Sequence, residues 1–264
     1  MTQLLNSRRS KLRCAGRVNC VLLVAVGLGI DSAKSASAAQ RIPTLVELFT
    51  SEGCSTCPPA DAVLEKLDRL QPVAGAQVIA MSEHVDYWDH GGWKDPFSSA
   101  ALTRRQESYK RRFGISEPYT PQMVVDGLTT FNGSNGLEAE SAIWNAAHQP
   151  KLVVQISPAG QRDAVVVEVA PARPGFPTVH AAELYVAVAQ DSGSSDVLRG
   201  ENHGRRLQYT AIVRTLRRVD RVNPESGFHK EIAVHANPGQ RLIAFVQESG
   251  NGKVLGSAMY MMPK

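Results

Sequence analysis

The cysteine pair Cys54 and Cys57 is the sequence feature that most restricts the fold of this chain. A short apolar run, residues 45–49, precedes the pair and predicts a buried strand. After the pair, apolar side chains recur at helical spacing over residues 60–67, which predicts an amphipathic helix. The two sulfur atoms are therefore expected where a strand meets a helix, close to free backbone N–H groups and the positive end of the helix dipole.

The first 39 residues have the pattern of a secretory signal peptide. Basic side chains are concentrated in residues 8–17, apolar residues and glycines fill residues 21–30, and small residues occupy positions 36–39. A helix of about ten residues covers roughly half of a ~30 Å membrane core, which favours a cleaved signal over a membrane anchor. We therefore predict a periplasmic or secreted protein with no membrane attachment after signal cleavage.

The leader also accounts for the basic charge of the chain. It carries six basic side chains and one acidic side chain, so the rest of the chain has a net charge of −1 rather than +4. Proteins that bind nucleic acid neutralise phosphates with an excess of Lys and Arg. The sequence therefore predicts no nucleic-acid partner.

Only Cys54 and Cys57 remain once the leader is removed. Two cysteines so close together could exchange disulfides, bind a metal ion or close a small structural ring. Such a four-residue ring would stabilise the fold by about 2 kcal/mol, against about 3 kcal/mol for a fifteen-residue loop, so it would be a weak staple. A copper or zinc site would need a nitrogen ligand as well, and His84 is the candidate. The residue pattern leaves all three uses open.

The remaining first half of the chain alternates between strand and helix patterns. Four further elements are predicted: a strand at 77–81, a helix at 98–113, a strand at 122–125 that turns at Asp126-Gly127 into a hairpin, and a closing helix at 138–147. This order predicts an α/β domain over residues 40–149, with helices on the faces of a mixed sheet.

The second half of the chain has a strand pattern with little helix. Seven segments alternate or run apolar at strand length: 151–157, 164–170, 181–189, 207–214, 231–236, 241–248 and 254–261. They predict an antiparallel β-sandwich domain over residues 150–264. The segment 200–204 between two of them is interpreted as a turn.

The order of these features resembles the thioredoxin superfamily: a strand, a C-x-x-C pair opening a helix, and later a Thr-Pro before another strand. The resemblance implies that Pro121 is cis and packs beside the disulfide, and that the backbone of Thr120 faces the substrate. It also implies Cys54 as the attacking cysteine and Cys57 as the resolving one. Glu47 would be the acid buried behind the pair.

A longer motif narrows the resemblance. Residues 46–61 read V-E-L-F-T-S-E-G-C-S-T-C-P-P-A-D, residues 84–88 read H-V-D-Y-W, and residues 119–122 read Y-T-P-Q. Together they resemble a secreted bacterial family of unknown function with a thioredoxin-like fold. The family implies a fold over about residues 42–262 and names no substrate.

Thiol–disulfide exchange with protein thiols or disulfides is the function these features favour, and it needs no cofactor. The prediction requires sulfur atoms that a partner can reach, with Pro121 next to them. The alternative is a non-enzymatic module that binds copper or zinc, or docks a partner, through the same region.

Overall fold

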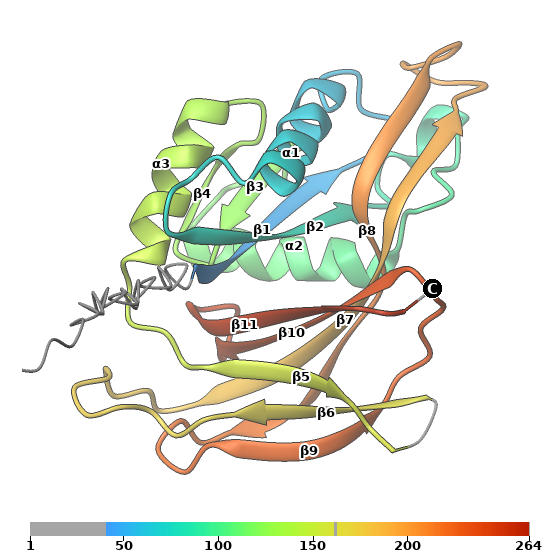
Figure 1. Cartoon of the computed structure of the whole chain (residues 1–264). Coiled ribbons are helices and arrows are strands. Elements are labelled where there is room, and N and C mark those ends of the chain that lie inside the picture. The colour runs from blue at the N-terminus through green and yellow to red at the C-terminus, as the bar shows by residue number, and fades with distance from the viewer. Residues whose placement is uncertain (1–40, 161–162, 264) are drawn as a thin grey trace, which may run out of the picture. The chain divides into compact units, whose positions relative to one another are not determined.

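A computed structural model describes residues 41–160 and 163–263 (Figure 1). The predicted signal peptide, residues 1–39, lies outside the described residues. The described residues belong to one unit, and the domain boundary predicted between residues 149 and 150 falls inside it. No helix in the described ranges combines the length and apolar character that a membrane crossing needs.

Eight strands form one mixed sheet in the order β11-β10-β7-β8-β2-β1-β3-β4. Their bounds are β1 (Ile42–Thr50), β2 (Ala76–His84), β3 (Gln122–Val125), β4 (Thr129–Asn132), β7 (Ala182–Asp196), β8 (Arg206–Val222), β10 (Gln240–Glu248) and β11 (Val254–Met261). β1 pairs with β2 in parallel and with β3 antiparallel. The sheet therefore continues from the first half of the chain into the second.

Three helices cover the first-half strands: α1 (Pro58–Leu70), α2 (Ala100–Phe113) and α3 (Gly136–Ala147), with a short 3-10 turn, η1 (Asp89–Gly91), before α2. Alternate residues of β1 point to opposite faces. Val46 and Leu48 pack with apolar residues of α1 and α3, whereas Leu45 and Phe49 pack on the α2 side. The helices thus lie on both faces of the sheet.

The second half holds seven strands in the predicted order, and three of them form a separate antiparallel sheet, β5-β6-β9. Their bounds are β5 (Val154–Pro158), β6 (Ala164–Val169) and β9 (Phe228–Ala233). This small sheet packs against β7, β10 and β11 through a shared apolar core (Figure 1). Two antiparallel layers therefore face each other here, but one layer is the continuation of the eight-stranded sheet.

The β7–β8 hairpin joins the two halves. Both strands are longer than their apolar patterns predict, 15 and 17 residues, and they pair antiparallel as far as Asp196 and Arg206. β8 also meets β2 in parallel, where Ser82 is paired with Ile212. Two register shifts bend the hairpin, at 184–185 and 188–189. Its tip, residues 197–205, is thereby carried to the C-terminal end of β1, where the cysteines lie.

Candidate functional site

Cys54 and Cys57 form a disulfide bond at the N-terminal end of α1. β1 ends at Thr50, and a short turn leads from it to Cys54. Cys57 is the residue that caps α1, and its carbonyl accepts the backbone N–H groups of Ala60 and Asp61. The prolines at 58 and 59 open the helix where backbone N–H donors are not needed. The pair is thus at the strand-to-helix junction that the sequence predicts.

Both cysteines have an exposed fraction of 0%. This contradicts the expectation of sulfur atoms open to a partner. The two residues between them, Ser55 and Thr56, are exposed, so the disulfide lies directly beneath the surface rather than in the apolar core. Residues from distant parts of the chain therefore cover the disulfide.

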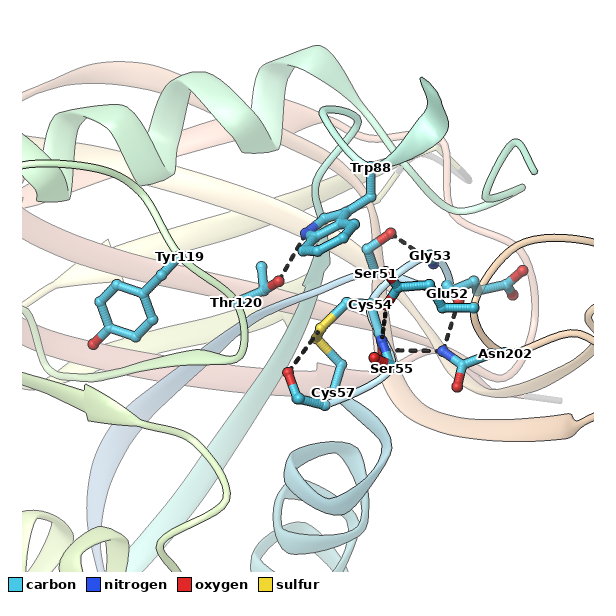
Figure 2. The surroundings of a disulfide bond; sticks show 12 residues. Ser51, Glu52, Gly53, Cys54, Ser55, Cys57, Trp88, Tyr119, Thr120 and Asn202 are labelled. Atoms are coloured by element: carbon cyan, nitrogen blue, oxygen red, sulfur yellow. Dashed lines mark hydrogen bonds between the residues drawn. A yellow bond between two sulfur atoms is a disulfide. The ribbon is translucent and has the colours of Figure 1, made fainter. Parts of the chain in front are cut away.

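Two segments make hydrogen bonds around the disulfide. Trp88, from the loop between β2 and α2, donates its indole N–H to the Thr120 hydroxyl at 2.8 Å. Asn202, from the tip of the β7–β8 hairpin, donates its side-chain N–H₂ to the carbonyls of Glu52 and Cys54, each at 2.9 Å. Figure 2 shows the indole of Trp88 and the amide of Asn202 on different sides of the disulfide.

A pocket of about 530 Å³ lies beside the first cysteine. It is lined by aromatic side chains of the β2–α2 loop and by the hairpin tip: Gly53, Tyr87, Trp88, His90, Trp93, Gly200 and Glu201. A Cβ atom on Gly53 would lie 3.0 Å from Cβ of Trp88, so a larger residue there would push the tryptophan away. The glycine before Cys54 is therefore needed for the close approach of Trp88.

Four buried titratable side chains gather behind the disulfide. His84 Nδ1 lies 2.7 Å from Oδ2 of Asp95, which also accepts the backbone N–H of Glu52 at 2.9 Å. Glu52 accepts the indole N–H of Trp93 at 2.7 Å. The fourth group, Asp61, is on α1 one helical turn after Cys57. These groups come from the turn after β1, from β2, from α1 and from the loop before α2, so only the folded chain brings them together.

Burial and pairing divide the charges in this cluster. Burial lowers the pKa of His84, but the nearby Asp95 carboxylate outweighs it and raises the net pKa. Burial alone would raise the pKa of Asp95. The charge of His84 and the hydrogen bonds that the Asp95 carboxylate accepts outweigh burial and lower this pKa. Burial raises the pKa of Glu52 and brings the pKa of Asp61 to about 7. His84 and Asp95 therefore stabilise each other's charged forms, whereas burial makes Glu52 and Asp61 harder to ionise.

Several polar atoms of the cluster have no hydrogen-bond partner among the described residues. They are Thr50 Oγ1, Glu52 Oε1, Asp61 Oδ1, His84 Nε2 and the Tyr209 hydroxyl. The ring of Tyr209 packs edge-on against His84, with ring centroids 4.6 Å apart. A buried polar atom without a partner costs free energy, so such a concentration is typical of a site where stability is not the first requirement.

Glu47 is buried, but its carboxylate is held on the α2 side of the sheet. It accepts hydrogen bonds from Arg105 and from the Tyr109 hydroxyl, both of α2. Burial and the neighbouring Glu47 raise the pKa of Glu83 well above its usual range, and Arg105 lies 3.7 Å from it. The Glu47 carboxylate is thus bound by α2, whereas Asp61 is the buried acid on the helix that Cys57 opens.

A family model described as DUF1223, a protein of unknown function, matches residues 45–247. The chain belongs to the DUF1223 family. A search of curated proteins finds no match to this DUF1223 chain.

Two solved structures resemble the DUF1223 chain over most of its length. A protein from Agrobacterium tumefaciens, AGR_C_4864, is 23% identical with a TM-score of 0.68, and the match covers 85% of this chain and 96% of that one. HBP35 of Porphyromonas gingivalis is 13% identical with a TM-score of 0.55, covering 85% and 78% of the two chains. At these identities the similarity extends to the fold alone.

Thr120 and Pro121 lie near the disulfide of this DUF1223 protein. Their peptide bond is cis, the geometry that the resemblance implies. Pro121 accepts the backbone N–H of Gly133, and a Cβ atom on Gly133 would lie 3.2 Å from Cβ of Ala60 in the first turn of α1. Thr120 is half-buried among the residues around the disulfide (Figure 2).

The alternative metal set of Cys54, Cys57 and His84 is not brought together. Among the residues that the structure describes, no group of three His, Cys, Asp or Glu side chains is placed to hold a metal ion. His84 is engaged with Asp95, and both sulfur atoms are in the disulfide.

Sequence analysis did not identify Asn202 or Asp61 as site residues. The tip of the β7–β8 hairpin has the composition of an ordinary turn, and Asn202 lies 148 positions after Cys54. Asp61 carried a signal that could have been used, because it follows Cys57 by four residues and so shares its helix face.

Proposed function

We propose that this protein is an exported thiol–disulfide exchange protein with a thioredoxin-like first half, using Cys54 and Cys57 as its redox pair. The observation that carries the proposal is the disulfide at the N-terminal end of α1. Backbone N–H groups and the helix dipole stabilise an anion there, and cysteines at such positions have pKa values of about 3.5 to 7.5 rather than about 8.5.

The surroundings of the pair support exchange more than a structural staple. The ring closed by Cys54 and Cys57 spans four residues and contributes about 2 kcal/mol, so stability alone is a weak reason for it. The disulfide lies under two exposed residues and beside a pocket with aromatic walls. Aromatic surfaces suit a peptide segment of a partner protein.

Export to the periplasm or the extracellular space is part of the proposal. The leader pattern of residues 1–39 supports it, and disulfides persist in these oxidising compartments.

The exchange needs no atoms beyond those of the two proteins. In the reduced protein the Cys54 thiolate attacks one sulfur of a partner disulfide, which forms a mixed disulfide and releases the other partner sulfur as a thiolate. Cys57, after losing its proton, then attacks Cys54 and releases the partner as a dithiol. The partner gains two electrons, and the Cys54–Cys57 disulfide is restored. The reverse sequence oxidises a partner dithiol.

Trapping the mixed disulfide tests this function. Reduced Cys57→Ser protein, mixed with oxidised glutathione, is expected to form a stable one-to-one adduct at Cys54, because no second sulfur is present to release it. Intact-mass spectrometry measures the adduct. The adduct should form with a pH midpoint below the free-thiol value of about 8.5.

Cys54→Ser is the matched control, since it also keeps one thiol of the Cys54–Cys57 pair. The Cys57 thiol of this variant is expected to react more slowly. The pocket borders Gly53, which is next to Cys54, whereas Cys57 does not line it. Equal reactivity of the two variants, or a midpoint at the free-thiol value, would contradict the assignment of Cys54 as the attacking group.

A further inference from the structure

The tip of the β7–β8 hairpin, residues 197–205, holds the backbone on both sides of the Cys54 carbonyl. Asn202 is 0% exposed and donates to the carbonyls of Glu52 and Cys54. Its neighbour Glu201 accepts the backbone N–H of Ser55 at 3.2 Å. Two adjacent residues of one loop thus bind three backbone groups of residues 52–55, around the first cysteine.

Asn202 is suited to this contact by its chemistry. A side-chain amide can donate two hydrogen bonds from one nitrogen, and both go to main-chain carbonyls here. Its carbonyl oxygen accepts a hydrogen bond from Arg205 at 2.8 Å, which fixes the orientation of the amide. A carboxylate of the same shape would face two carbonyl oxygens with no hydrogen to donate.

The hairpin tip is otherwise attached weakly to the site. Residues 198–201 and 203–205 are exposed, so Asn202 is the buried residue of this stretch, whereas Val197, at the base of the tip, is buried in an apolar cluster with Leu207 and Tyr209. Gly200 and Gly204 bracket it with φ values of 80° and 77°, a region that favours glycine. Few contacts have to break for residues 198–205 to move away from the disulfide while Val197 stays in its cluster.

We propose that Asn202 is a positioning residue that gates the disulfide, so that a thiol reaches Cys54 only after the hairpin tip has released it. The inference rests on the proposed function and deepens it, because it explains how a pair with 0% exposure can take part in exchange. The pocket beside Gly53 and Gly200 then becomes continuous with the opened disulfide, and a partner segment can enter there.

Reduction by dithiothreitol tests the gate without a biological partner. One dithiothreitol thiolate attacks Cys54 and releases Cys57 as a thiolate, and the second dithiothreitol thiolate then displaces Cys54. Dithiothreitol is oxidised to its cyclic disulfide, and the protein gains both electrons. Samples quenched in acid, alkylated and weighed by mass spectrometry give the rate of reduction over a range of dithiothreitol concentrations.

Asn202→Asp is the decisive variant because it keeps the volume of the side chain. Losing two hydrogen bonds favours the open tip, so reduction at a low dithiothreitol concentration should be about tenfold faster than in the unsubstituted protein. Asn251→Asp is the control. Asn251 lies in the β10–β11 turn, is also buried, and donates to the backbone carbonyl of Arg105. Its rate should be unchanged.

Glu201→Ala, at an exposed position, provides a second variant in case Asn202→Asp does not fold. It removes the contact with Ser55 and should give a smaller acceleration. Reduction of both variants at the unsubstituted rate would overturn the gate. That result would leave the glutathione adduct of Cys57→Ser untouched, so failure of the gate and failure of the proposed function are separate outcomes.

Discussion

We expect Arg105→Met to lower the free energy of unfolding at pH 7 by about 3 to 5 kcal/mol, because it leaves the buried Glu47 carboxylate without its counter-charge. The methionine fills much of the space of the arginine stem, so the loss is electrostatic rather than a cavity effect. Urea denaturation followed by circular dichroism measures the change.

The contacts of Arg105 explain the size of this effect. Its guanidinium bonds to Glu47 and donates to the Tyr109 hydroxyl at 3.1 Å and to Gln247 at 3.2 Å. The charge also lies 5.1 Å from the ring centroid of Phe245. The arginine therefore joins α2 to β1 and β10, and all of these contacts are lost together.

Two further variants separate the charge effect from helix effects. Arg104→Met changes the exposed neighbour on α2 and should alter stability little. Glu47→Gln combined with Arg105→Met removes both charges and should recover part of the loss. If Arg105→Met were no more destabilising than Arg104→Met, the buried pair would not stabilise α2 on the sheet.

We expect Asp61→Asn to stabilise the protein above pH 7 and to flatten its stability between pH 4 and 7. Burial raises the pKa of Asp61 from 3.8 to about 7, so in this range the folded chain holds a proton that the unfolded chain releases. Stability therefore falls as the pH rises, by up to about 4 kcal/mol from this group. Asparagine has no proton to lose and escapes the fall.

The pH dependence of urea denaturation, measured between pH 4 and 8, tests this prediction. The two proteins should be similar near pH 4 and diverge toward pH 8. His84 keeps Asp95 as its partner in the variant, so the ion pair is not broken. Glu65→Gln, a half-exposed acid on the same helix, should run parallel to the unsubstituted protein. A parallel curve for Asp61→Asn as well would show that Asp61 is not held neutral by burial.

Local patterns predicted the elements around the cysteines well. The apolar spacing after Cys57 predicts α1, and the helix is found at Pro58–Leu70. The turn at Asp126-Gly127 predicts the β3–β4 hairpin, in which Gln122 is paired with Asn132. These predictions succeed because helix faces and tight turns depend on residues a few positions apart.

The length of β7 and β8 could not be predicted in the same way. Residues 190–196 are polar or glycine, without the apolar alternation of a half-buried strand, yet they continue β7 because the backbone pairs with β8. Hydrogen bonds between strands do not depend on side chains, so the sequence pattern carries little trace of them. The reach of the hairpin to the disulfide follows from this pairing.

By itself, the sequence determined the position of the cysteine pair at the start of a helix and the alternation of strands and helices around it. These depend on near neighbours in the chain. Only the tertiary structure decided that Asn202 binds the Cys54 carbonyl, that Glu47 faces Arg105, and that Asp61 lies with Glu52 and His84. Burial and long-range contacts are set when the whole chain packs, and they decide which polar groups are charged and which sulfur atoms a partner can reach.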